Sequence, residues 1–120
     1  MGRESILERY SRQLPLVGVE GQEKLRRSAV LVVGAGGLGS SVLLYLAAAG
    51  VGRLMVIDRG YVDPPDLNRQ ILYSERDVGK AKARRAVERL RELDSSIEIS
   101  GYSMDVSDPQ FEKLVEVADV

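Results

Sequence analysis

Four glycines within a stretch of six residues form the segment best suited to chemistry. Gly34, Gly36 and Gly39 follow the pattern G-x-G-x-x-G, and Gly37 lies between them. Such glycines allow a tight turn, let phosphate approach the backbone and permit close packing of a helix on a strand. Free N–H groups at the start of that helix attract a polyphosphate. The segment predicts a nucleotide-binding turn, and the alternative is a packing turn that binds no ligand.

Asp58 is the next candidate, because it stands 19 residues after Gly39 at the end of an apolar segment. A carboxylate at that distance from the glycines accepts hydrogen bonds from the ribose hydroxyls of a nucleotide. The alternative role for Asp58 is that of a turn or helix cap. Together with the glycines, Asp58 predicts an adenine nucleotide, and NAD is the default ligand at this point.

Three further segments lie outside the pattern of a dehydrogenase: residues 9–13 (RYSRQ), 66–70 (DLNRQ) and 78–83 (VGKAKA). The last two bring Arg69 and Lys82 to the carboxyl end of the predicted sheet, where the phosphates should lie. A triphosphate carries more charge than the pyrophosphate diester of NAD, and guanidinium and ammonium groups are its natural stabilisers. One such cation is more often a solvated surface charge, but several of them beside a glycine turn favour ATP.

The elements that must position these residues alternate between strands and helices. Residues 29–33 (AVLVV) and 54–57 (LMVI) are apolar runs typical of strands buried on both faces, and residues 97–102 predict a third strand. Residues 60–74, with Pro64 and Pro65, predict a loop. Helices are expected at residues 5–10, 19–27, 40–49, 78–93 and 109–117, the last with Asp108 as its N-cap.

This order of elements predicts an α/β fold with a Rossmann-like parallel sheet and flanking helices, joined by right-handed crossovers. Residues 1–28 are expected to form an N-terminal helical arm that precedes the sheet. Residues 29–120 are expected to form the N-terminal half of a nucleotide-binding domain. Residues 118–120 have the pattern of a strand that is just beginning. We therefore expect an incomplete sheet of about three strands whose C-terminal part is missing.

The composition excludes several classes of site. The chain has neither cysteine nor histidine, so it holds no disulfide, thiolate zinc site, cysteine nucleophile or histidine base. Its net charge of -1 does not suggest a nucleic-acid binder. The polar N-terminus has no signal-peptide core, and the longest apolar run, residues 42–49, is too short to span a bilayer. We expect a cytoplasmic protein with neither a nucleic-acid nor a membrane partner.

Five segments resemble, in order and spacing, the ThiF/MoeB/HesA family, the bacterial and archaeal relatives of ubiquitin-activating enzymes. The resemblance covers the chain from about Arg9 to its end. It implies that the C-terminal glycine carboxylate of a ubiquitin-like protein, often a sulfur carrier, attacks the α-phosphate of ATP to give an acyl-adenylate and pyrophosphate. The five segments are RYSRQ (9–13), GAGGLGS (34–40), the strand end at Asp58, DLNRQIL (66–72) and VGKAKA (78–83).

The resemblance also implies roles for single residues. The four glycines would lie against the nucleotide in an ATP-binding adenylation domain, and Asp58 would bind the ribose hydroxyls. Arg69 and Lys82 would act in catalysis by holding the phosphates and the developing charge. Asn68 and Gln70 would be neighbouring polar contacts.

Arg12 matches an arginine that family dimers supply to the ATP of the partner subunit, so the resemblance implies a homodimer. Relatives also use an aspartate that binds Mg²⁺, here expected beyond Val120, and many carry zinc in a C-terminal part. The parent protein is thus expected to be an adenylyltransferase, and this chain alone an inactive fragment that binds nucleotide at most. Two alternatives are an NAD-binding dehydrogenase-type domain, which leaves Arg69 and Lys82 without a role, and a non-catalytic nucleotide-binding or dimerisation module.

Overall fold

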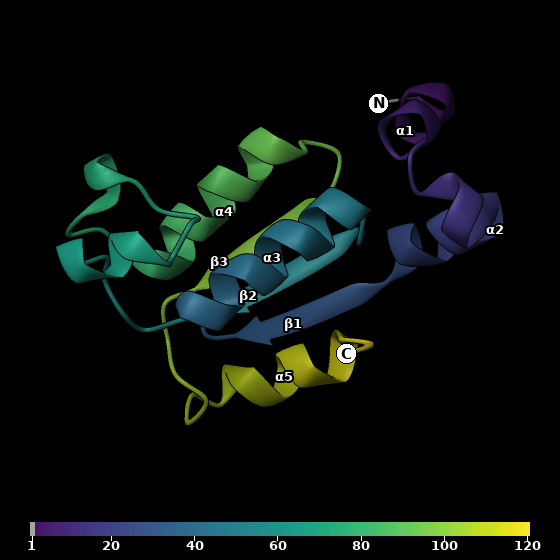
Figure 1. Ribbon diagram of the computed structural model, residues 1–120. Coiled ribbons are helices and arrows are strands. Elements are labelled where there is room, and N and C mark those ends of the chain that lie inside the picture. Colours follow the sequence, from purple (N-terminus) through teal and green to yellow (C-terminus); the bar gives the residue numbers. More distant parts are fainter. Residues whose placement is uncertain (1) are drawn as a thin grey trace.

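The computed structural model describes the backbone of residues 2–120 and the side chains of residues 2 and 5–120 (Figure 1). Two short 3₁₀ turns, Pro64–Asn68 and Glu75–Asp77, lie in the loop between the second strand and the fourth helix. The helices and strands follow the order α1 (Arg3–Arg9), α2 (Leu14–Arg27), β1 (Ala29–Val33), α3 (Gly37–Ala49), β2 (Arg53–Ile57), α4 (Lys82–Leu93), β3 (Glu98–Tyr102) and α5 (Gln110–Val117).

The three strands form one parallel sheet in the order β1-β2-β3. Their register aligns Val33 with Ile57 and Ile57 with Tyr102, so all three strands end at the same edge. The fold prediction, a Rossmann-like parallel sheet of about three strands, is confirmed. Because the strands end together, the residues that follow them are brought to one side of the molecule.

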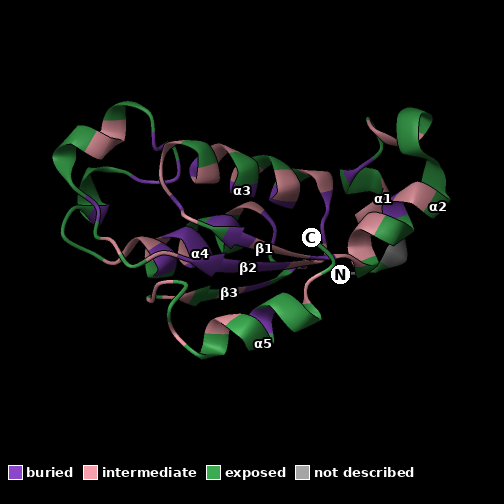
Figure 2. Ribbon diagram, turned by 90° about the horizontal axis from the view of Figure 1, so that it is seen from below, coloured by how far each residue is buried: buried purple, intermediate pink, exposed green. Residues whose placement is uncertain are grey.

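Helices cover both faces of the sheet, α3 and α4 on one and α5 on the other (Figure 2). Side chains that alternate along β2 divide between two cores. Leu54 and Val56 are buried with Leu43 of α3, and Met55 and Ile57 are buried on the side of α5. This three-layer packing fixes the position of the sheet edge on which the site is built.

The end of the chain lies along the edge of β1 that faces away from β2. The N–H of Asp119 donates to the carbonyl of Ala29 at 2.7 Å, and the N–H of Leu31 donates to the carbonyl of Val120 at 2.9 Å. Of residues 118–120, expected to begin a strand, the last two thus pair with β1. The chain moves outward from β1 in one direction through β2 and β3 and in the other through residues 119–120. Such a switch point opens a crevice at the carboxyl ends of the strands.

The N-terminal helices pack against the opposite end of the sheet. Tyr10 is buried and donates to the carboxylate of Asp94 at 2.5 Å. Gln13 donates to the carbonyl of Ala49, at the end of α3, at 2.7 Å. Helix α2 consists of two helical pieces that meet at Gly18, whose φ of 72° is left-handed, and the second piece matches the helix predicted at residues 19–27. None of the helices within residues 2–120 is long and apolar enough to cross a membrane.

The predicted bounds of two other helices are wrong at their N-termini. Helix α3 begins at Gly37 rather than at residue 40, so two of the glycines belong to its first turn. Helix α4 begins at Lys82 rather than at residue 78. Residues 78–81 form a turn instead, in which Gly79 has a φ of 86° and donates its N–H to the carbonyl of Val62. This turn places Lys82 at the helix N-terminus.

Candidate functional site

The glycine turn joins the end of β1 to the start of α3 at the sheet edge where all strands end. Gly34 has a φ of 97°, which other residues rarely adopt, and its N–H donates to the carbonyl of Ile57 at 2.7 Å. A Cβ on Gly39 would lie 1.8 Å from the carbonyl oxygen of Gly34. The turn therefore depends on glycine at both positions, since one needs the dihedral angle and the other the close approach of the helix.

Asp58 follows β2 and holds the glycine turn through its carboxylate. One oxygen accepts the N–H of Ala35 at 2.8 Å, and the other accepts the N–H of Gly60 at 2.6 Å. The side chain is only partly buried. The cap considered from the sequence is thus present, and each oxygen keeps a second lone pair that could accept a ribose hydroxyl.

Tyr73 and Ser40 stabilise the turn by hydrogen bonds, and neither was singled out in the sequence. The hydroxyl of Tyr73 donates to the carbonyl of Ala35 at 2.7 Å, and that of Ser40 donates to the same carbonyl at 3.3 Å. Burial, and then the negative charge of Asp58, raises the pKa of Tyr73, so its hydroxyl remains a donor at neutral pH. The serine at the end of GAGGLGS was the only available signal, because the contact of Tyr73 spans 38 residues.

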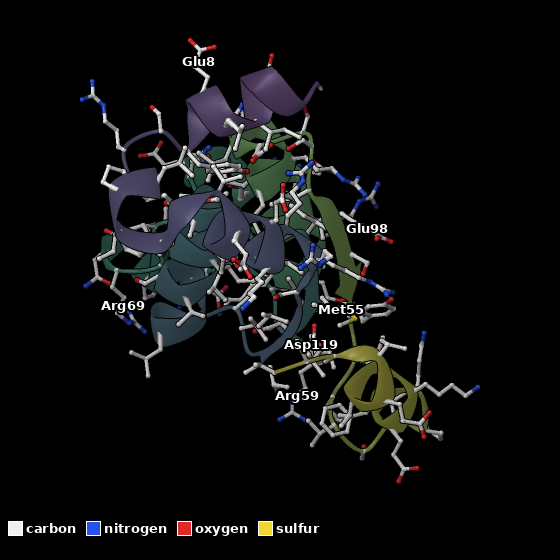
Figure 3. The ribbon with its side chains drawn as sticks, turned by 90° about the vertical axis from the view of Figure 1, so that its right-hand side faces the viewer. Glu8, Met55, Arg59, Arg69, Glu98 and Asp119 are labelled. Carbon is white, nitrogen blue, oxygen red and sulfur yellow. The ribbon has the colours of Figure 1, made fainter. Side chains whose placement is uncertain are left out.

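Arg69 lies beside the first turn of α3. A Cβ on Gly37 would lie 3.7 Å from the Nε atom of Arg69, and the guanidinium donates to the carbonyl of Pro65 at 3.0 Å. It also donates to the side-chain oxygen of Asn68 at 3.0 Å. The side chain is exposed and points outward (Figure 3). Arg69 is therefore held by its own loop at the helix N-terminus, with donors left for an anion.

Lys82, the first residue of α4, reaches the same end of the sheet. Its Nζ atom lies 3.4 Å from a carboxylate oxygen of Asp66, and the two side chains are 14% and 15% exposed. A hydrogen bond from the backbone N–H of Asp63, together with the ammonium of Lys82, keeps the pKa of Asp66 below its ordinary value. Asp66 is a third residue of the site, after Tyr73 and Ser40, to which the sequence analysis gave no role.

Gln70 is buried against Gly36, and its amide nitrogen lies 3.8 Å from where a Cβ of that glycine would be. Its side-chain oxygen has no hydrogen-bond partner among the residues that the structure describes. Buried polar atoms are rarely left unpaired. Asn68, by contrast, is exposed. The amide of Gln70 is thus the better placed of the two for a ligand beside the glycine turn.

A cleft of about 370 Å³ opens beside the glycine turn, at the carboxyl ends of the strands. Its volume lies within the usual range for small-molecule sites, roughly 300 to 1,000 Å³. Nonpolar side chains from the ends of β1 and β2 meet others from the loop after β3, and Asp58 stands at its wall. The residues that line it are Val33, Gly34, Ile57, Asp58, Arg59, Gly60, Met104, Asp105 and Val106.

Arg12, unlike Arg69 beside Gly37 and Lys82 beside Gly60, lies far from the glycine turn. It is exposed in the segment between α1 and α2, next to Gln13, which contacts the C-terminal end of α3. The glycine turn lies at the N-terminal end of the same helix, about 20 Å away at 1.5 Å per residue. Among the side chains that the structure describes, no group of three acidic residues is arranged to hold a metal ion.

Residues 10–120 match the ThiF family over almost the whole chain. This chain belongs to the ThiF family. The sulfur carrier protein adenylyltransferase of Thermus thermophilus is 52% identical over 98 residues, which cover 80% of this chain and 36% of that protein. The chain thus spans about a third of this ThiF-family relative. The resemblance stated from the sequence is confirmed.

Solved structures agree with the ThiF assignment and with the fold. PaaA superposes with a TM-score of 0.89 and 31% identity, covering 98% of this chain and 40% of PaaA. E. coli MccB, solved with ATP, superposes with a TM-score of 0.77 and 34% identity, covering 83% of this chain and 31% of MccB. The Rossmann-like fold is confirmed by both.

Proposed function

We propose that this chain carries the nucleotide site of an enzyme that adenylylates the C-terminal glycine of a ubiquitin-like sulfur carrier protein with ATP. One observation carries the proposal: Arg69, Lys82 and Asp58 come from three separate segments and gather at the sheet edge that carries the glycine turn, where Asp58 also lines the cleft. The Thermus thermophilus relative is a sulfur carrier protein adenylyltransferase, and the MccB structure contains ATP. Both support ATP as the ligand.

In the proposed reaction a carboxylate oxygen of the carrier forms a bond to the α-phosphorus of ATP. The bond between the α-phosphorus and the bridging oxygen breaks, and pyrophosphate leaves with the electron pair. Negative charge therefore grows on the leaving group. Arg69 and Lys82 would stabilise this charge, because fixed cations act most strongly where charge develops in the transition state. The N–H groups at the start of α3 add further donors.

Mg²⁺ would accompany the triphosphate, whose charge it would partly neutralise. The described residues provide no cluster of three acidic side chains for it. Two carboxylates line the cleft, Asp58 and Asp105, and both oxygens of Asp58 already accept backbone N–H groups. We therefore assign no step of the reaction to a magnesium ligand within residues 2–120.

Arg12 fits the proposal as a cation that reaches the nucleotide of a second copy in a homodimer. Its side chain is exposed at the end of α3 that lies farthest from its own glycine turn. Tyr10 and Gln13 anchor the backbone on both sides of it. An exposed cation on an anchored segment is placed to contact another molecule rather than its own site.

The experiment is calorimetric titration of the 120-residue chain with Mg·ATP and, in parallel, with NAD. Arg69→Ala and Lys82→Ala should each weaken ATP binding by about tenfold or more, since each removes a charge-assisted hydrogen bond. Arg84→Ala is the matched control, because it removes one positive charge from an exposed position of α4. ATP affinity should be unchanged in that variant.

Binding of NAD in preference to ATP would contradict the proposal and favour a dehydrogenase-type domain. ATP binding that is insensitive to Arg69→Ala and Lys82→Ala would also contradict it. ATP binding without adenylylation of a carrier would identify the chain itself as a nucleotide-binding module.

A further inference from the structure

The candidate site holds a negative charge where a polyphosphate is expected to bind. Asp66 places a carboxylate oxygen 3.4 Å from the Nζ atom of Lys82, and both side chains are largely buried. An anion that approaches Lys82 therefore meets Asp66 as well. The inference drawn from this pair rests on the proposed function, which takes the phosphates of ATP to Lys82.

The position of Asp66 does not depend on Lys82. The oxygen that faces Lys82 also accepts the N–H of Asp63 at 2.9 Å, and this hydrogen bond closes the 3₁₀ turn Pro64–Asn68. The same hydrogen bond holds the pKa of Asp66 below its ordinary value, so the carboxylate is charged at neutral pH. The turn itself thus fixes a full negative charge at this place.

Lys82, in turn, is held by more than its ion pair. Its backbone N–H donates to the carbonyl of Gly60 at 3.0 Å. Its side-chain methylenes pass Gly60, where a Cβ would lie 3.7 Å from the Cδ atom of Lys82. The stem of the lysine is therefore oriented by packing, and the ammonium is the only part that Asp66 binds.

We propose that Asp66 is a built-in counter-ion of Lys82 that competes with bound phosphate. In the nucleotide-free protein Asp66 forms an ion pair with the ammonium of Lys82. In the complex the carboxylate repels the phosphates that contact the same ammonium. Asp66 therefore lowers the affinity of the site for phosphate-rich ligands, pyrophosphate included. In the proposed reaction, the ion pair between Asp66 and Lys82 forms again as pyrophosphate leaves, and this favours release of the product.

The test is Asp66→Asn, which removes the charge and keeps an oxygen to accept the N–H of Asp63. Two unit charges at this range in a partly solvated site interact by enough to change affinity about tenfold. We expect Asp66→Asn to bind Mg·ATP and pyrophosphate about tenfold more tightly than the unaltered chain, by calorimetric titration. Adenosine, which has no phosphate, should bind equally to both proteins.

Asp63→Asn is the matched control, because it removes the same charge from the same turn at a position exposed to solvent. ATP affinity should be nearly unchanged in that variant. Circular dichroism and thermal unfolding of each variant establish that the fold is retained.

Equal or weaker ATP binding by Asp66→Asn overturns the inference and leaves the proposed nucleotide site intact. Equal tightening of ATP and adenosine overturns it too, since the effect is then not on phosphate. Absence of ATP binding by the unaltered chain and by Asp66→Asn overturns the proposed function and this inference with it.

Discussion

At the scale of single residues, the glycines of the turn serve different purposes. A Cβ on Gly39 would collide with the carbonyl oxygen of Gly34 at 1.8 Å, whereas a Cβ on Gly36 would meet only the side chain of Gln70 at 3.8 Å. Gly39 is thus needed for the fold. Gly36 instead leaves room beside the predicted path of the phosphates.

Gly39→Ala should lower the free energy of unfolding by about 3 kcal/mol, because the helix and the turn must separate to admit a methyl group. Gly36→Ala should change it by no more than about 1 kcal/mol while it weakens ATP binding. Urea unfolding and titration with Mg·ATP measure the two effects. A Gly39→Ala protein as stable as the unaltered chain would show that α3 does not need this close approach.

At the scale of elements, the N-terminal helices are joined to the sheet layer through a buried carboxylate. Asp94, at the end of α4, accepts hydrogen bonds from Tyr10 at 2.5 Å and from the hydroxyl of Ser96 at 2.6 Å. Burial raises the pKa of Asp94, but the hydrogen bonds from Ser96 and Tyr10 outweigh it and leave the pKa below its ordinary value. The charged form of Asp94 therefore stabilises the packing of α1 on α4.

Asp94→Asn should lower the free energy of unfolding at pH 7 by about 2 kcal/mol, since hydrogen bonds to a charged group are replaced by neutral ones. A depressed pKa in the folded state gives stability that is present above the unfolded pKa, near 4, and is lost as pH falls through the folded value. The difference between the two proteins should therefore shrink below about pH 4.

Urea unfolding at several pH values measures this difference. Glu112→Gln, an exposed charge on α5, is the control and should leave the free energy of unfolding nearly unchanged. A gap between Asp94→Asn and the unaltered chain that stays constant down to pH 3 would show that the carboxylate charge does not hold the helices.

At the scale of the whole molecule, the site and Arg12 lie at opposite ends of α3. Arg12 cannot reach the glycine turn of its own chain, because the length of α3 separates the two. A second copy could supply the arginine if the N-terminal helices of one protomer approach the cleft of its partner. Residues from two chains would then complete each site.

Mixing Arg12→Ala with Lys82→Ala protein tests this arrangement. Neither variant alone should support pyrophosphate exchange with ATP in the presence of the carrier, in the enzyme that contains this chain. In a random mixture about a quarter of the sites regain both cations, because each heterodimer assembles one intact site. Exchange should therefore return to roughly a quarter of the unaltered rate. A mixture as inactive as its components would show that Arg12 does not act between subunits.

The sequence predicted the elements well wherever the signal was local. The run AVLVV at residues 29–33 is a strand with the predicted bounds, and the glycine turn lies between that strand and a helix as its pattern required. Apolar residues predicted the buried face of α4, including Ala83, Ala86 and Leu90. The predicted start of α4 was wrong. The left-handed φ of Gly79 and its hydrogen bond to Val62 end the helical pattern there, and Val62 lies 17 residues earlier in the chain.

The sequence by itself determined the glycine turn, the parallel sheet and the cations at its edge, since residue type and spacing fix all three. Only the tertiary structure decided which neighbours those residues acquire. Tyr73 beneath the turn, Asp66 beside Lys82 and Arg12 at the far end of α3 are results of packing between segments distant in the chain. Such contacts leave no local pattern, because any hydroxyl, carboxylate or guanidinium that packing brings to the right place can make them.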